Sequence, residues 1–184
     1  MMQRRHALLA AAFWPSLGLR AQAAAPAVPA ELASELPGAR LLGSGRMTFL
    51  GLHIYDARLW AGAQAPGADW AAAAFALELI YARSLSGEKI AERSLDEMKR
   101  QGPIDAAAGE RWLGSMKQMF PDVKAEDRIT GLNLPGTGAR FYVNGKVRGE
   151  PRDTDFARLF FGIWLSPRTS EPALRESLLG RKPS

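Results

Sequence analysis

Residues 139–164 read ARFYVNGKVRGEPRDTDFARLFFGIW, and this stretch contains the strongest local signals in the chain. The run 139–143 is rich in strand-forming residues, and the pair Asn144-Gly145 after it favours a type I′ hairpin turn. Residues 146–149 then form a short return strand. Asp153 is a suitable N-cap for a helix whose apolar residues recur at helical spacing. The stretch therefore predicts an antiparallel strand pair followed by an amphipathic helix.

The segments around this stretch carry the same two kinds of signal. Strand patterns occupy residues 46–60, 74–83 and 127–134, and helix patterns occupy residues 86–102, 105–120 and 170–179. The first strand segment is apolar on both faces, so it is either one central strand or a bent hairpin with a bulge at Gly51. We interpret the cluster Gly43-Ser44-Gly45 before it as a turn. This order of strands and helices predicts an α+β fold with an antiparallel sheet rather than a parallel βαβ repeat.

The N-terminus has the layout of a secretory signal peptide. Arg4 and Arg5 form a positive region, a short apolar run follows, and Ala21-Gln22-Ala23 is a cleavage site of the A-x-A type. The run is too short for a membrane span, which takes about 20 apolar residues. An N-terminal core helix is the alternative. We expect cleavage after Ala23 and export of the mature chain across the inner membrane to a bacterial periplasm.

Cleavage after Ala23 changes the charge and the domain organisation of the chain. The net charge falls from +5 to +2, because the removed segment holds three arginines and no acidic residue. A charge of this size gives no reason to expect a nucleic-acid partner. Residues 24–37 are rich in alanine and proline and are predicted to be a flexible linker. Residues 38–180 are predicted to form one domain, followed by a tail over 181–184 and with no membrane span in the mature chain.

The composition excludes several kinds of chemistry. The 184 residues include no cysteine, which rules out disulfides, thiolate nucleophiles and cysteine-ligated zinc. Only two histidines are present, and neither a nucleotide-binding glycine motif nor a metal-ligand spacing occurs. We therefore expect no cofactor and no metal. Glu78 lies mid-strand among apolar residues, where it is either a buried carboxylate or the solvent-facing member of an alternating strand.

Five residues are candidates for ligand contact. Tyr55, Tyr81 and Tyr142 lie on predicted strands, where a tyrosine can pack its ring and offer its hydroxyl group to a ligand. The simpler interpretation is strand propensity and core packing. Arg40 and Arg46 flank the predicted turn at residues 43–45, and an arginine there could hold a carboxylate or a phenolate bidentately. The alternative for both arginines is an ordinary surface cation.

Three segments of the chain resemble the bacterial chalcone isomerase-like family. They are residues 43–60 (GSGRMTFLGLHIYDARLW), residues 75–102 and residues 120–180, and together the resemblance extends over roughly residues 38–180. Its most specific pieces include FYVNGK (residues 141–146) and FGIWL (residues 161–165). The resemblance implies an open-faced β-sandwich: a curved antiparallel sheet that carries a layer of helices on one face, with a ligand cleft between them. The superfamily includes true chalcone isomerases, which need no cofactor, and relatives that bind fatty acids without catalysis.

The resemblance also implies roles for individual positions. The arginine of the plant enzymes aligns best with Arg40, with Arg46 as the rival. The positions of the enzyme's threonine, tyrosine and asparagine fall on Leu50, Ile90 and Glu97. Three of the four polar positions are therefore not reproduced, and a leucine or an isoleucine cannot hold a water molecule or donate to an enolate oxygen.

These observations lead to three functional hypotheses. The first is a periplasmic, non-catalytic protein that binds a fatty acid or a similar apolar carboxylate, with Arg40 or Arg46 at the head group and Tyr55 and Tyr81 along the cleft. The second is a cofactor-independent isomerase of the intramolecular-lyase type that acts on an enone. The third is an interaction module for an envelope partner, which an exposed apolar patch would favour. The oligomeric state stays open.

Overall fold

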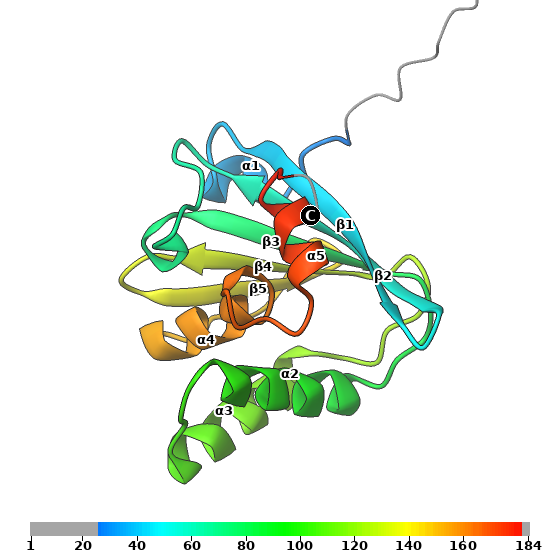
Figure 1. Ribbon diagram of the computed structural model, residues 1–184, viewed down its shortest axis with the longest axis vertical. Coiled ribbons are helices and arrows are strands. Elements are labelled where there is room, and N and C mark those ends of the chain that lie inside the picture. Colours follow the sequence, from blue (N-terminus) through cyan, green and yellow to red (C-terminus); the bar gives the residue numbers. More distant parts are fainter. Residues whose placement is uncertain (1–25, 182–184) are drawn as a thin grey trace, which may run out of the picture.

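A six-stranded antiparallel sheet forms the centre of the protein. The structure, a computed structural model, describes residues 26–181. The strands pair in sequence order. They are β1 (Arg40–Phe49), β2 (Leu52–Ala61), β3 (Phe75–Tyr81), β4 (Arg128–Leu134), β5 (Gly138–Val143) and β6 (Lys146–Gly149). Figure 1 shows that the sheet is curved and that helices gather below it. The predicted α+β fold with an open, curved antiparallel sheet is confirmed.

Two-residue turns close the hairpins at both edges of the sheet. Asn144 and Gly145 join β5 to β6 with φ values of 49° and 79°, as a type I′ turn requires. Leu50 and Gly51 join β1 to β2 with nearly the same values, 49° and 77°. The strand segment predicted over residues 46–60 is therefore a hairpin, which is one of the two predicted alternatives.

Four helices follow the predicted helical segments. They are α2 (Gly87–Gln101), α3 (Ala106–Met119), α4 (Thr154–Leu165) and α5 (Pro172–Leu178), and a short 3₁₀ turn, η1 (Trp70–Ala72), precedes β3. The side chains of Asp105 and Asp153 cap α3 and α4, each accepting a backbone N–H at 2.9 Å. At the start of α2, the N–H of Gly87 donates to Asp122 at 2.9 Å instead of being capped by Ser86. A distant loop therefore completes this helix end.

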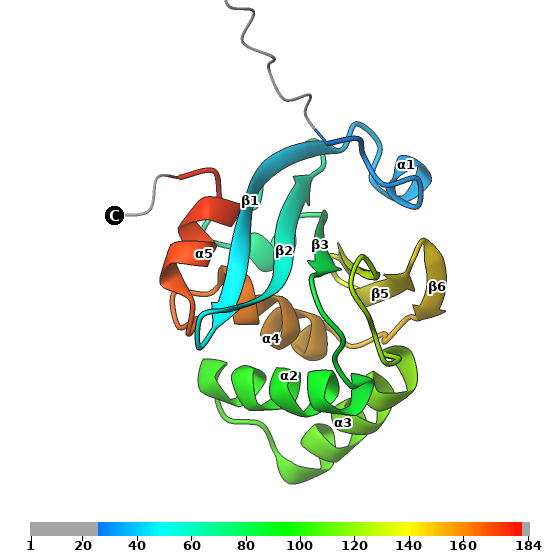
Figure 2. The ribbon, with the colours of Figure 1, turned by 90° about the vertical axis from the view of Figure 1, so that its right-hand side faces the viewer.

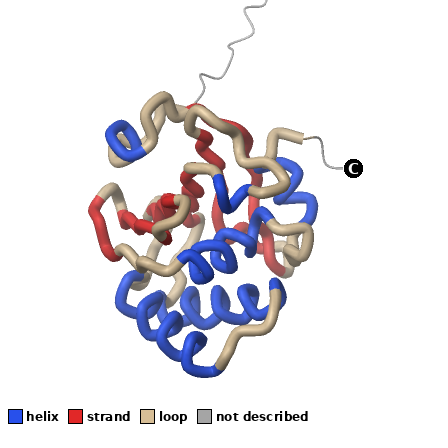
Figure 3. Tube along the Cα trace, turned by 90° about the vertical axis from the view of Figure 1, so that its left-hand side faces the viewer, coloured by secondary structure: helices blue, strands red, loops and turns tan. Residues whose placement is uncertain are grey.

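The helices form two unequal layers around the sheet. Helices α2, α3 and α4 lie on one side, and α5 crosses β1 and β2 on that same side (Figures 1 and 2). A single short helix, α1 (Leu32–Glu35), lies apart from them near the opposite end of the molecule (Figures 2 and 3).

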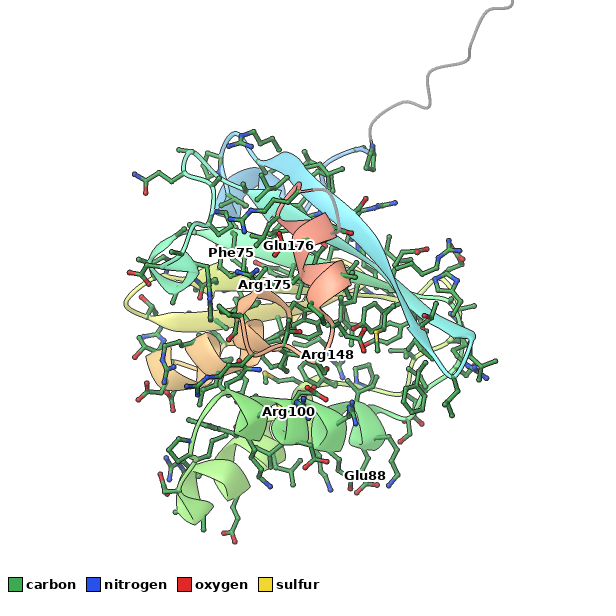
Figure 4. All side chains as sticks on the ribbon, in the orientation of Figure 1. Phe75, Glu88, Arg100, Arg148, Arg175 and Glu176 are labelled. Atoms are coloured by element: carbon green, nitrogen blue, oxygen red, sulfur yellow. The ribbon has the colours of Figure 1, made fainter. Side chains whose placement is uncertain are left out.

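The larger layer makes the main core with the sheet, and phenylalanines dominate that core. The ring centroids of Phe141 in β5 and Phe160 in α4 are 5.0 Å apart, and those of Phe75 in β3 and Phe161 in α4 are also 5.0 Å apart. Both pairs have edge-to-face geometry. Figure 4 labels Phe75 and shows side chains filling most of the space between the layers.

The glycines at 43 and 45 lie within β1 and not in the predicted turn. A Cβ at Gly43 would lie 2.1 Å from the carbonyl oxygen of Ser177, and one at Gly45 would lie 2.6 Å from Leu174. The glycines therefore allow α5 to lie directly on the strand. The prediction of a turn here is wrong because the glycines serve a tertiary contact, which local sequence does not reveal.

The segment 24–37, predicted as a flexible linker, contains α1 in its described part. Leu32 and Leu36 are buried against Trp60, Ala76 and Leu132 of the sheet. Ion pairs hold the same segment to the sheet: Glu31 accepts from Nη2 of Arg128 at 2.9 Å, and Glu35 accepts from Nη1 of Arg140 at 2.6 Å. Apolar burial and charge pairing thus order a segment whose composition is typical of a linker.

Glu78 lies on the sheet face that α1 covers, and it is a buried carboxylate. Its Oε2 atom accepts from the indole N–H of Trp60 at 2.9 Å and lies 3.6 Å from Nη1 of Arg58. Its Oε1 atom lies 3.4 Å from Nη1 of Arg128. The first of the two predicted environments for Glu78 is therefore the observed one, and its partners make the burial possible.

Residues 26–181 contain neither a candidate membrane-spanning helix nor a candidate metal-binding cluster. No helix there is long and apolar enough to cross a membrane, and no cluster of three or more acidic or histidine side chains could hold a metal ion. The predicted signal peptide over residues 1–23 lies outside the described residues.

Candidate functional site

A cavity of about 350 Å³ lies between the sheet and the helical layer. Strands β1 to β4 form one wall, and α2 and α4 form the other. Most of the lining is apolar and includes Met47, Leu79, Ile90, Phe160 and Ile163. Its size and lining are those of a small-molecule site.

The register of the sheet brings the strand side of this wall together. Met47 pairs with Tyr55 across β1 and β2, and Tyr55 pairs with Tyr81 across β2 and β3. Directly paired residues share a face of the sheet, so these three side chains form one row toward the helices. The rings of Tyr55 and Tyr81 meet edge to face with centroids 5.9 Å apart.

The hydroxyl group of Tyr55 marks a polar end of the cavity. Its oxygen accepts the indole N–H of Trp164 at 3.0 Å. Burial raises the pKa of Tyr55 well above its ordinary value, so the hydroxyl group keeps its proton at any physiological pH. Among the described residues that proton has no hydrogen-bond acceptor. Tyr55 is therefore a donor that is free to act on a ligand in the cavity.

Charged side chains of α2 lie at the same end of the cavity. Nη2 of Arg93 lies 2.6 Å from Oε1 of Glu97, and Nε of Arg100 lies 3.4 Å from Oε2 of Glu97. Glu97 is only 6% exposed, whereas Arg93 is largely exposed at the cavity rim. Arg93 and Glu97 line the same cavity as Tyr55, and Glu171 lines it as well.

The five residues predicted as candidates for ligand contact separate into two groups. Tyr55 and Tyr81 line the cavity, and Tyr142, Arg40 and Arg46 do not. Arg46 lies on the opposite face of β1 from Met47, where its Nε donates to Asp56 at 3.0 Å. Arg40 pairs with Ala61 at the far end of the hairpin. At about 3.3 Å per residue, it lies roughly 23 Å along the strand from Met47.

Comparison of the sequence with known proteins identifies the family of this protein. The chalcone isomerase-like family matches residues 30–180, which is most of the chain. The chain belongs to the chalcone isomerase-like family. A protein of Haemophilus influenzae is 30% identical to it over 108 residues, which are 59% of this chain and 52% of that protein. The chain thus spans about half the length of this relative.

A solved plant structure shares the fold of this chalcone isomerase-like protein. It is the fatty-acid binding protein AtFAP1 of Arabidopsis thaliana, with a TM-score of 0.63 over 78% of this chain and 88% of that chain. The two sequences are 15% identical, so the similarity concerns the fold alone.

The polar positions assigned by the family resemblance also separate in the structure. Ile90 and Glu97 both line the cavity, from one face of α2. Leu50 is at the tip of the β1–β2 hairpin, 85% exposed, and does not line the cavity. The alignment thus places two of these three positions at the cavity, with an apolar and an acidic side chain.

The arginine that does line the cavity, Arg93, was not among the residues predicted from the sequence. Arg93 belongs to the set Ile90, Arg93, Ser94 and Glu97, which all line it. Their spacing of three, four and seven residues is the signature of one helix face. The helical spacing of these residues was therefore the available signal. It did not reveal that this face of α2 would line the cavity.

Proposed function

We propose that this protein binds a fatty acid or a similar apolar carboxylate in the cavity between the sheet and α2, without transforming it. The observation that carries the proposal is that the hydroxyl donor of Tyr55 and the guanidinium group of Arg93 both belong to the lining of one largely apolar cavity. The fatty-acid binding named for the Arabidopsis relative supports the same ligand class.

The chemistry of such a ligand matches the distribution of polar groups. A carboxylate accepts hydrogen bonds and gains most from charged donors, which Arg93 supplies, and from hydroxyl donors, which Tyr55 supplies. The alkyl chain gains about 0.8 kcal/mol for each methylene that leaves water, and the walls around Leu79, Phe160 and Ile163 provide the apolar surface. Arg93 thereby takes the head-group role that was predicted for Arg40 or Arg46.

The side chains at the positions of the enzyme's polar set favour binding over isomerisation. An intramolecular attack on an enone needs donors that stabilise the developing enolate. Of the three remaining positions that the resemblance assigns to the enzyme's polar set, Ile90 has no donor and Leu50 lies outside the cavity. Glu97 is a carboxylate, which opposes negative charge on an oxygen.

The location we propose is the periplasm, and this proposal rests on the signal-peptide pattern of residues 1–23.

Titration with lauric acid tests the proposal. Trp164 lines the cavity, so its fluorescence is expected to change saturably as the acid binds. Arg93→Gln should weaken binding at least tenfold, because a hydrogen bond to a charged group contributes about 1.5–3 kcal/mol. Arg46→Gln is the matched control, since it removes an exposed arginine on the other face of the sheet. Absence of saturable binding, or equal losses in both variants, would contradict the proposal, and turnover of a chalcone would contradict its non-catalytic part.

A further inference from the structure

The tip of the β1–β2 hairpin exposes a group of apolar side chains. Phe49, Leu50 and Leu52 are 53%, 85% and 50% exposed, and they surround a single turn. Figure 1 shows this turn at the edge of the molecule, to the right of the helices. Single exposed apolar residues are ordinary on protein surfaces, but three around one turn form a patch. We refer to these three residues as the hairpin tip.

The backbone at the hairpin tip indicates that Leu50 is not there for folding. Its φ of 49° lies in the left-handed region, which is unfavourable for residues other than glycine, asparagine and aspartate. The turn between β5 and β6 has the same geometry and uses Asn144, the residue type that suits it. Leu50 is the most exposed large apolar residue of the described chain, so contacts within the protein do not offset this cost.

The hairpin tip is continuous with the cavity. Phe49 both lines the cavity and exposes half of its surface to solvent. Leu50 and Leu52 flank the turn beyond it. An apolar molecule that enters or leaves the cavity beside Phe49 therefore meets further apolar surface before it reaches water. A contact between this surface and an apolar phase would lower the cost of that transfer.

Positive charge flanks the hairpin tip. Residues 43–55 contain no acidic side chain, and Arg46 is exposed on β1. The N–H of Ala82 donates to the carbonyl of Ile54, and continuing this register places Arg83 opposite His53. Arg83 is exposed and forms no ion pair within residues 26–181. Asp56, which pairs with Arg46, is the first acid after the tip along the chain, so Arg83 is the arginine beside the tip whose charge is not paired within residues 26–181.

We propose that the hairpin tip docks on an anionic lipid bilayer and inserts Leu50 and its apolar neighbours among the acyl chains. Arg46 and Arg83 would then face the negatively charged head groups, which attract basic residues near a membrane surface. Docking in this way would bring the rim of the cavity at Phe49 to the bilayer, from which the apolar ligand would be taken or to which it would be delivered. This role of docking rests on the proposed function, whereas docking itself does not.

The test is vesicle co-sedimentation with the purified product of the full chain. We expect binding to vesicles of phosphatidylethanolamine with phosphatidylglycerol and weaker binding to phosphatidylcholine alone. Leu50→Asn should reduce partitioning at least tenfold, because one leucine side chain no longer leaves water. It should not lower thermal stability, because Asn-Gly suits this turn. Val147→Asn is the matched control, since Val147 is 61% exposed on β6 and should be neutral.

Several results would overturn the inference. Equal partitioning of wild type and Leu50→Asn would exclude the hairpin tip, and no binding of wild type to either vesicle would exclude docking. Self-association in sedimentation velocity that Leu50→Asn abolishes would assign the tip to a second copy of the chain instead. Titration with lauric acid in vesicle-free buffer is measured separately for each variant. Vesicle binding without any lauric acid binding would refute the proposed function and leave docking supported.

Discussion

The indole N–H of Trp164 donates to the hydroxyl oxygen of Tyr55 at 3.0 Å, across 109 positions of sequence. This bond joins α4 to β2 at one end of the cavity. It occupies an acceptor site of the tyrosine and leaves its proton free. A single contact therefore stabilises the packing of the layers and orients a donor toward the cavity.

Tyr55→Phe should weaken the binding of lauric acid roughly tenfold, because a hydrogen bond to a carboxylate is lost. The indole N–H of Trp164 also loses its acceptor, so the free energy of unfolding should fall by about 1–3 kcal/mol. Tyr81→Phe is the control, since Tyr81 lines the same cavity and its hydroxyl group forms no side-chain hydrogen bond within residues 26–181. Fluorescence titration and urea denaturation measure the two effects. Equal effects of both variants would contradict this role of Tyr55.

Glu97→Gln should tighten the binding of lauric acid about fivefold, because a neutral side chain no longer competes with the ligand carboxylate for Arg93. An interaction of about 1 kcal/mol between partly exposed charges sets this scale. The gain in affinity of Glu97→Gln over wild type should become smaller as salt is added, because salt screens the charges. Glu92→Gln is the control on the same helix, since Glu92 pairs with Lys89 and Lys117. Weaker binding in Glu97→Gln would mean that Glu97 itself holds the ligand.

Asp153→Ala should lower the free energy of unfolding by about 1–2 kcal/mol at neutral pH, because the N-cap of α4 is lost. Burial alone would raise the pKa of Asp153, but hydrogen bonds from the Phe156 amide and the Trp112 indole outweigh it and lower the pKa. A lowered pKa in the folded state means that this stability is present above about pH 4 and is lost as the pH falls further.

The difference in stability between wild type and Asp153→Ala should accordingly narrow below about pH 4. Asp155→Ala provides the control, since Asp155 is an exposed acid in the same helical turn. Urea denaturation across the pH range gives both curves. A difference that is independent of pH down to full protonation would show that the carboxylate form of Asp153 contributes nothing.

Gly43→Ala should lower the free energy of unfolding by about 1–3 kcal/mol, the range for inserting a methyl group into a packed contact. The new Cβ would lie 2.1 Å from a backbone oxygen of α5, so β1 and the helix must separate. Gly67→Ala should have no such effect, because nothing lies within 4 Å of a Cβ at that position. Calorimetry of both variants checks the difference, and equal melting temperatures would contradict it.

Elements whose deciding interactions are local could be predicted from the sequence. Asn144-Gly145 specified its turn, and Asp105 and Asp153 mark the starts of their helices, because a turn or a cap depends on a few neighbouring residues. The burial of Glu78 was harder to predict from the sequence. A carboxylate in the middle of a strand can be buried here only because Trp60, Arg58 and Arg128 supply donors. Residues 24–37 were predicted to be a linker from their composition alone. Composition carries no information on the sheet surface that α1 covers.

By itself the sequence determined the α+β class, the order of strands and helices, and the presence of Tyr55 and Tyr81 on strands. Only the tertiary structure decided which arginine lies at the cavity. A shift of one residue in strand register moves a side chain to the other face of the sheet. Such a shift would exchange the environments of Arg46 and Met47. Arg93 reaches the site because α2 packs against α4 and lines the same cavity as β2 and β3, and that arrangement depends on long-range packing that no local pattern records.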